Sequence, residues 1–136
     1  MSRLLLAKNF AQEIKSAQKD EATSMIDYFC GYGHECVNNP GNAALRLQIA
    51  MNNVERYYSV VGVLEEMDKS VKVFESFVPK FFAGISEIQN SRANTNKPKP
   101  KLSPKARELV NDYLRDEITF YEFCRQRLHR QFQAIS

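Results

Sequence analysis

The chain has 136 residues and a mass of 15.7 kDa, with 43% hydrophobic and 26% charged residues and a formal net charge of +3. This size suits one domain with a core rather than two, and the composition is that of a globular protein. No run approaches the roughly 20 apolar residues of a membrane span, and the opening MSRLLL lacks the apolar core of a secretory leader. Nineteen basic against 16 acidic residues permit an anionic partner without requiring one.

The first quarter predicts a helix and then a cysteine loop. Apolar residues among polar ones over residues 3–18 indicate the helix, and the polar stretch KDEATS connects it onward. Residues 25–29 form a short apolar stretch that suits a strand and leads to Cys30.

Two of the three cysteines, Cys30 and Cys36, lie in FCGYGHEC. This spacing fits a small disulfide loop and equally fits two reduced cysteines. Zinc is less favoured, because His34 supplies only a third ligand and His129 lies far along the chain. Cys124 falls on a helical pattern and suits a small buried hydrophobic residue.

A turn, VNNPG, is followed by Asn42, which predicts the N-cap of a helix through AALRLQIAMNNVERYY. The β-branched run from Tyr58 to Val63 then predicts a buried strand. Apolar residues spaced by three and four from Leu64 predict an amphipathic helix that Pro79 ends. A strand leading directly into a helix is an α/β element, and a buried strand needs sheet neighbours.

Residues 81–88 suit a short helical piece, and residues 90–103, NSRANTNKPKPKLS, form a basic loop spaced by prolines. Ser103 and Pro104 are a helix start, from which one long helix is expected almost to the end. The aromatic residues Phe120, Tyr121 and Phe123 suit its core or interface face.

The basic loop is the most informative candidate site. Its Arg, Lys, Asn and Thr side chains suit a phosphate or a sulfate, but its charge-rich composition favours a solvated surface linker. It has no interleaved aromatic residues to stack bases, which disfavours nucleic acid. Glu65 and Glu66 follow a predicted strand, where α/β sheets place ligands, but a helix N-terminus also favours acids. His34 has only its neighbour Glu35 nearby, which disfavours a catalytic role.

The chain resembles the C-terminal part of the uronyl and heparan sulfate 2-O-sulfotransferase family, including its insect Pipe-like members. The resemblance covers roughly residues 25–133. Its blocks are YFCGYGHEC, NPGNAALRLQIAMNNVERYYSVVGVLEEMDKS, FVPKFFAGISEI, NKPKPKLSP and ITFYEFCRQRLHRQF.

This resemblance implies transfer of a sulfo group from 3′-phosphoadenosine 5′-phosphosulfate to the 2-hydroxyl of a uronic acid in heparan, dermatan or chondroitin sulfate. It implies a membrane-anchored enzyme of the Golgi lumen, trimeric in the family, with a disulfide between Cys30 and Cys36 and no metal. The basic loop would bind the donor and the glycosaminoglycan chain. The residues implied there are Arg92, Asn94, Thr95, Asn96 and Lys97.

The predicted fold is therefore α/β: a helix-rich C-terminal fragment of a P-loop-like sulfotransferase fold, with one or two strands and three to four helices. One partial domain is expected over 1–136, divided into 1–24, 25–89, the basic loop 90–103 and the long helix 104–136.

The family's phosphosulfate-binding loop, catalytic histidines and membrane anchor have no counterpart here, so we expect a fragment, an incomplete gene model or an alternative C-terminal exon set. No catalytic residue is expected in this chain, and the chain alone should be inactive. The alternative is a noncatalytic helical module that binds anionic polysaccharide or a partner subunit.

Overall fold

A computed structural model describes residues 24–37, 41–90 and 101–136. These ranges hold eight α-helices, one 3-10 helix and no strand. In chain order they are α2 (Met25–Cys30), α3 (His34–Val37), α4 (Ala43–Tyr57), the 3-10 helix η1 (Leu64–Glu66), α5 (Met67–Phe77), α6 (Pro79–Phe82), α7 (Ile85–Asn90), α8 (Pro104–Tyr113) and α9 (Arg115–Ile135).

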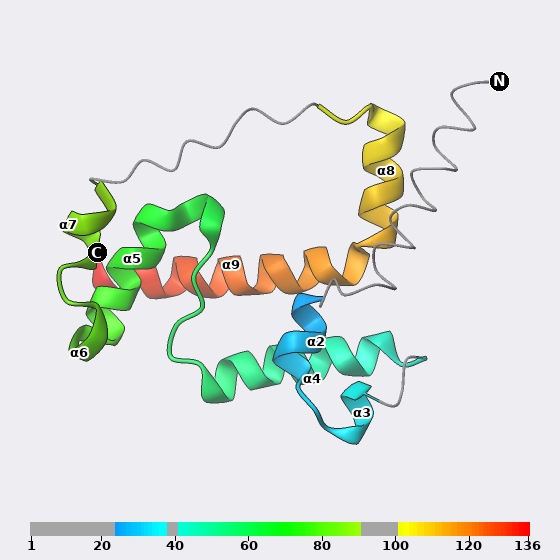
Figure 1. Ribbon diagram of the computed structural model, residues 1–136, viewed down its shortest axis with the longest axis horizontal. Coiled ribbons are helices and arrows are strands. Elements are labelled where there is room, and N and C mark those ends of the chain that lie inside the picture. Colours follow the sequence, from blue (N-terminus) through cyan, green and yellow to red (C-terminus); the bar gives the residue numbers. More distant parts are fainter. Residues whose placement is uncertain (1–23, 38–40, 91–100) are drawn as a thin grey trace.

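The long helix α9 is the axis on which the other elements assemble (Figure 1). Helices α2 and α4 pack against each other and against α9, and α5 packs along α9 nearer the C-terminus. Helices α6 and α7 follow beside α5, whereas α8 stands at a steep angle to α9. Residues 58–63, which are extended at both ends and are called the extended segment below, join the α2–α4 part to the α5–α7 part.

Helix starts follow the capping residues of the sequence. The Asn42 side chain accepts a hydrogen bond from the Leu45 amide at 3.1 Å, and the Ser103 hydroxyl accepts one from the Ala106 amide at 3.2 Å. Both caps confirm the predicted starts of α4 and α8. Helix α5 ends at Phe77, and Pro79 opens α6, so the predicted stop is also confirmed.

The strand expected over residues 25–29 is wrong, because this stretch is helix α2. The Ser24 hydroxyl accepts a hydrogen bond from the Asp27 amide at 3.0 Å. The Glu117 carboxylate on α9 accepts from the Met25 and Ile26 amides at 3.2 and 3.4 Å. Together these acceptors satisfy the first free amides of a helix.

The strand expected from Tyr58 to Val63 is also absent, although the backbone is extended at both ends, with φ −112° and ψ 117° at Tyr58 and φ −121° and ψ 124° at Val63. Side chains take the place of sheet neighbours. Arg127 donates to the Tyr58 carbonyl at 2.6 Å, and Gln131 donates to the Ser59 carbonyl at 2.8 Å. This segment therefore lies on α9 rather than in a sheet.

Ser70 of α5 forms hydrogen bonds with Val63, at the other end of this segment. Its hydroxyl accepts from the Val63 amide at 2.9 Å and donates to the Val63 carbonyl at 3.1 Å. Gly62 permits this approach, since a Cβ there would lie 2.9 Å from the Phe74 ring and 3.2 Å from the Ser70 Cβ. A side chain at position 62 would thus push α5 away.

The single helix expected over 104–136 is two helices, α8 and α9, which meet at Leu114 (φ −98°, ψ 20°). The Leu114 amide still donates to the Val110 carbonyl at 2.9 Å, and the Ile118 amide donates to the Leu114 carbonyl at 2.8 Å. Backbone hydrogen bonding therefore continues through the bend. No glycine or proline marks the bend in the sequence.

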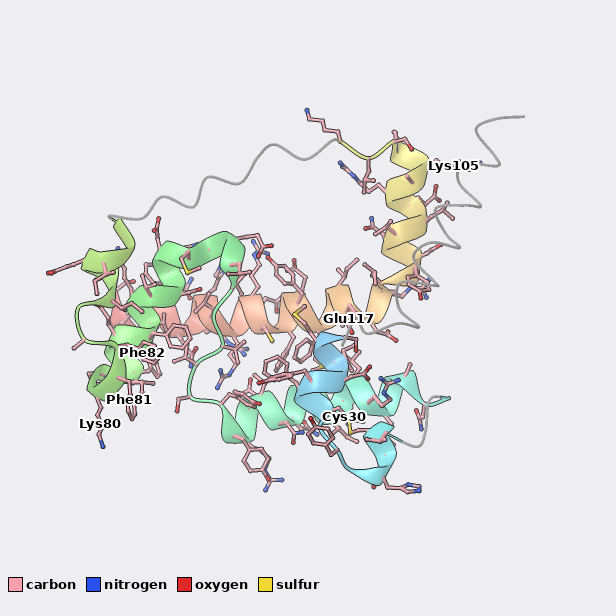
Figure 2. All side chains as sticks on the ribbon, viewed as in Figure 1. Cys30, Lys80, Phe81, Phe82, Lys105 and Glu117 are labelled. Carbon is pink, nitrogen blue, oxygen red and sulfur yellow. A yellow bond between two sulfur atoms is a disulfide. The ribbon has the colours of Figure 1, made fainter. Side chains whose placement is uncertain are left out.

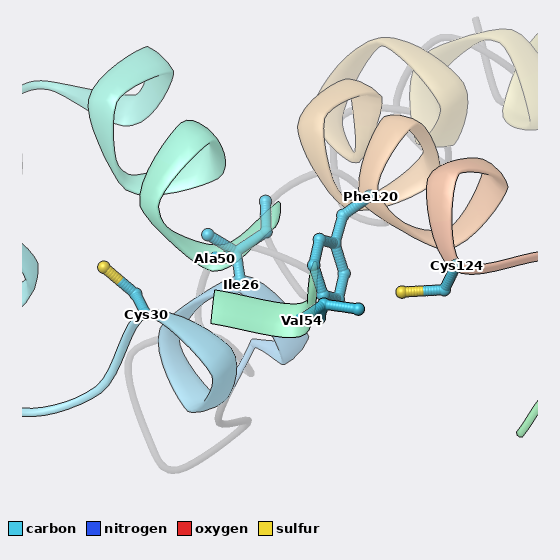
Figure 3. Close-up of a cluster of buried hydrophobic side chains, with 6 residues drawn as sticks. All are labelled: Ile26, Cys30, Ala50, Val54, Phe120 and Cys124. Carbon is cyan, nitrogen blue, oxygen red and sulfur yellow. The ribbon is translucent and has the colours of Figure 1, made fainter. Parts of the chain in front are cut away.

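Two buried clusters form the core. One joins α2, α4 and α9 (Figure 3), and it contains Ile26, Cys30, Ala50, Val54, Phe120 and Cys124. The other joins the extended segment, α5 and α9 through Val60, Val63, Val73 and Leu128. Val60 and Val63 of the expected strand are thus buried and Val61 is partly buried, but against helices. The described fold is helix-rich as predicted, while the predicted strands and the small number of helices are wrong.

Candidate functional site

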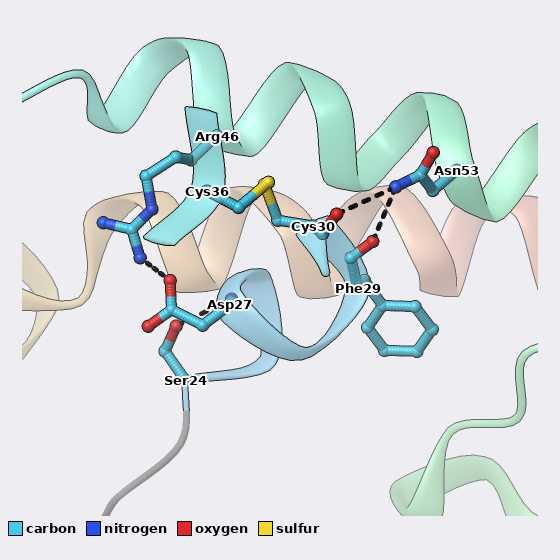
Figure 4. The surroundings of a disulfide bond; sticks show 7 residues. All are labelled: Ser24, Asp27, Phe29, Cys30, Cys36, Arg46 and Asn53. Carbon is cyan, nitrogen blue, oxygen red and sulfur yellow. Dashed lines mark hydrogen bonds and ion pairs between the residues drawn. A yellow bond between two sulfur atoms is a disulfide. The ribbon is translucent and has the colours of Figure 1, made fainter. Parts of the chain in front are cut away.

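The cysteine loop is closed by a disulfide between Cys30 and Cys36, with their Cα atoms 5.8 Å apart (Figure 4). The disulfide implied by the resemblance is therefore formed. Asn53 of α4 donates to the carbonyls of Phe29 and Cys30 at 2.9 and 3.2 Å, and Arg46 pairs with Asp27. These contacts fix the loop to α4.

Glu66 is the centre of a charged cluster between η1 and α9. Its carboxylate lies 2.5 Å from His129 Nε2, 3.1 Å from Lys69 Nζ and 3.8 Å from Arg125 Nε. Burial raises the pKa of Glu66, but the hydrogen bonds from His129 and Lys69 and their charges outweigh it, so the net pKa is lowered.

The neighbouring Glu65 accepts a hydrogen bond from the Tyr121 hydroxyl at 3.2 Å. Both acids of the Glu65–Glu66 pair are therefore used to join η1 to α9. This arrangement favours the structural interpretation of the pair over a ligand site.

The five residues expected to bind donor or substrate, Arg92, Asn94, Thr95, Asn96 and Lys97, lie outside the described residues. The start of α8, which follows this loop, is described. There the Ser103 hydroxyl already accepts a hydrogen bond from the Ala106 amide, and Pro104 has no amide hydrogen to donate. The cap and the proline therefore leave fewer backbone amides free for an anion at this helix start.

The two histidines of the described part of the chain have different surroundings. His34 is exposed on the short helix α3, and no hydrogen bond or ion pair with another described residue engages it. His129 is engaged by Glu66.

Cys124 is buried as predicted, and its burial raises the pKa of the thiol to about 11. Its thiol therefore stays protonated at neutral pH. Phe120 is fully buried, and Tyr121 and Phe123 pack against the two core clusters, which confirms the core interpretation.

Within the ranges 24–37, 41–90 and 101–136, no group of three or more His, Cys, Asp or Glu side chains is arranged to hold a metal ion. No helix in the part of the chain that the structure describes has the length and apolar character needed to cross a bilayer.

Sequence reasoning missed the polar residues that hold the extended segment. Arg127 is buried and bonds to a carbonyl 69 residues earlier, and His129 meets Glu66 across 63 residues. The sequence offers one local signal for such contacts, which is a polar residue on the apolar face of a helical pattern. When that side chain is buried, it needs a hydrogen-bond partner.

The sequence of this chain is similar to those of several known proteins. Over 131 residues the chain is 34% identical to the uronyl 2-sulfotransferase homolog pip of Drosophila melanogaster, covering 91% of this chain and 25% of that protein. Over 116 residues it is 34% identical to heparan sulfate 2-O-sulfotransferase 1 of Xenopus laevis, covering 81% of this chain and 31% of that protein. Over 114 residues it is 32% identical to uronyl 2-sulfotransferase of Mus musculus, covering 77% of this chain and 27% of that protein. No family model and no solved structure matches the chain.

These matched proteins are sulfotransferases by name. More particularly, the chain is homologous to a segment of the uronyl and heparan sulfate 2-O-sulfotransferases, which confirms the resemblance drawn from the sequence. The chain spans about a quarter to a third of the length of the curated relatives it matches.

Proposed function

We propose that residues 1–136 form the helix-rich C-terminal part of a glycosaminoglycan uronyl 2-O-sulfotransferase. The whole enzyme would transfer a sulfo group from 3′-phosphoadenosine 5′-phosphosulfate to the 2-hydroxyl of a uronic acid in heparan, dermatan or chondroitin sulfate. The homology to enzymes with these names carries the proposal. The disulfide supports an oxidising compartment, and we place the whole enzyme in the Golgi lumen as a membrane-anchored trimer.

The described part supplies structure rather than the reacting groups. Sulfo transfer needs a general base for the acceptor hydroxyl and positive groups for the developing charge. His129 is part of the Glu66 cluster that joins η1 to α9, and His34 stands exposed without a carboxylate to orient it. We therefore assign the base to another part of the enzyme and infer that residues 1–136 alone do not transfer sulfo groups. Arg92 and Lys97, with Asn94, Thr95 and Asn96, would supply donor and substrate contacts.

The extended segment supports the proposal that this chain lies beside the sheet of a larger P-loop-like α/β fold. Among the described residues, no hydrogen bond engages the backbone of Val60, Val61 or Gly62. Free amides and carbonyls on an extended backbone can pair with a β-strand. We propose that the remaining part of the enzyme supplies that strand.

The loop assignment is tested by affinity for heparin and for the sulfo donor, measured on the chain with Arg92→Ala and Lys97→Ala together. The double variant should bind more weakly, and the loss for heparin should shrink at high salt. Its control is Lys105→Ala with Arg107→Ala, which removes the same charge from the exposed helix α8 (Figure 2). Equal losses in both double variants would show that only net charge matters and would remove the loop from the site.

A second candidate function is a noncatalytic helical module that binds anionic polysaccharide or a partner subunit. The two buried clusters favour it, because they give the described helices a core of their own. Size-exclusion chromatography with a circular dichroism melt separates the two proposals. A monodisperse chain with a cooperative melt supports the module, whereas self-association through the free backbone at residues 60–62 supports the enzyme segment.

A further inference from the structure

Helix α8 carries an apolar stripe along one face. Its members are three and four residues apart, as one face of a helix requires, and they are Ala106, Leu109 and Val110. None of the ten residues of α8 is buried, and Leu109 is 37% exposed. Isolated helices shorter than about 12–15 residues are marginal in water, so a helix of this length needs a packing partner for its stripe.

The chain reaches residue 24 at the foot of α8, where α8 meets α9. There Glu117 accepts hydrogen bonds from the first two amides of α2 at 3.2 and 3.4 Å. Ser24 lines a small cavity together with Tyr113 and Leu114, which lie at the bend between the two helices. Figure 2 shows Glu117 near this end of α8 and Lys105 at the other end. The residues before Ser24 are therefore connected to the chain beside α8.

The segment 3–18, which lies outside the described residues, has an apolar stripe in its sequence. At 3.6 residues per turn, one face of a helix over this segment would carry Leu6, Phe10, Ile14 and Ala17. Such a helix would be about 24 Å long, whereas α8 with ten residues measures about 15 Å. The segment is therefore long enough to cover the whole stripe of α8.

We propose that residues 3–18 form an amphipathic helix that packs in parallel on the apolar stripe of α8. Both helices run toward the bend at Leu114, and residues 19–23 connect the segment to α2 across up to about 17 Å. Because both helices rise equally per residue, a register with Phe10 beside Ala106 places Ile14 beside Val110. The large Phe10 ring then faces a small side chain, which lets the two helices interdigitate.

An occupant from the same chain has an advantage over a separate molecule. A short connection holds the segment near α8 at an effective concentration on the order of millimolar. Packing of this helix on α8 would also fix the angle between α8 and α9, which meet through continuous backbone hydrogen bonds at the bend. The inference concerns how this chain folds and does not depend on sulfo transfer.

The test is hydrogen exchange of the 136-residue chain, followed by mass spectrometry. Phe10→Asp with Ile14→Asp should speed exchange over 104–113 by about tenfold or more, because α8 then opens without breaking the packing. Gln12→Asp with Ser16→Asp is the matched control, since it adds the same charge to the opposite face of the segment and should leave this exchange unchanged. Slow exchange over 67–77, where Val73 is fully buried, shows that each variant is folded.

A reciprocal pair of variants probes the α8 side of the contact. Leu109→Asp should speed exchange over residues 3–18 by about tenfold, because the segment loses the surface on which it is ordered. Asn111→Asp introduces the same charge on the outer face of α8 and should leave exchange over 3–18 as it is in the unaltered chain.

Two results would overturn the inference. One is equal exchange over 104–113 in the two double variants, or exchange of α8 in the unaltered chain at the rate of an unstructured peptide, which would assign the stripe to a part outside this chain. The other is protection of α8 that grows with protein concentration, which would assign the stripe to a second copy. Either result leaves the proposed function unaffected, because that proposal is tested by sulfo transfer and by heparin affinity.

Discussion

Ser70→Ala tests whether side chains replace sheet neighbours along the extended segment. Ser70 is 2% exposed, and its hydroxyl bonds to both the amide and the carbonyl of Val63. The carbonyl keeps a second donor, the Glu66 amide at 3.0 Å, so the substitution leaves only the Val63 amide without a partner. An unpartnered buried donor costs about 1–3 kcal/mol.

Alanine also favours a helix over serine by about 0.5 kcal/mol, which offsets part of this cost. The expected net loss in the free energy of unfolding is therefore about 0.5–2.5 kcal/mol. Urea denaturation followed by circular dichroism measures it. Ser76→Ala is the control, because Ser76 is exposed on the same helix, and it should be neutral or slightly stabilising. Equal unfolding free energies for the two variants would refute the assigned role of Ser70.

Three further predictions concern packing, the disulfide and the buried thiol. Gly62→Ala should destabilise by about 1–3 kcal/mol in the same urea assay, whereas Gly41→Ala, with open space around its Cβ, should be neutral. Cys36→Ser should lower stability by about 2 kcal/mol and abolish the effect of a reductant on the melt, since the disulfide to Cys30 closes a short loop. The Cys124 thiol should react with a thiol reagent at pH 8 only when the chain unfolds. The pKa of this thiol in the folded chain is about 11, above the ordinary 9.0, so the free energy of unfolding should fall as the pH rises from 9 to 11. Rapid labelling of the folded chain would contradict this burial.

Local signals in the sequence predicted the helix starts at Asn42 and Ser103 and the stop before Pro79. These features depend on hydrogen bonds between residues three or four apart, or on the missing amide of proline, so the local sequence contains them. The cysteine spacing left the disulfide open, and the resemblance to a family implied it. The candidate donor-binding residues in the basic loop remain a prediction.

Local signals could not show whether residues Tyr58 to Val63 form a strand in a sheet or a segment packed against helices. A run of buried valines looks alike whether it packs in a sheet or against helices. What decides the matter is the source of hydrogen bonds for the backbone, and here it includes Arg127 and Gln131, about 70 residues away. The bend at Leu114 was not predicted for a related reason, because no residue near it is one that breaks a helix.

We propose that this chain is a working part of a uronyl 2-O-sulfotransferase whose reacting groups lie in another part of the enzyme. The most direct measurement replaces the matched segment of Xenopus laevis heparan sulfate 2-O-sulfotransferase 1 with this chain and follows radiolabelled sulfo transfer to desulfated heparan. We expect label on the uronic acid 2-hydroxyl with the chimera and none with the 136-residue chain alone. A folded chimera without activity, or robust transfer by the chain alone, would contradict it.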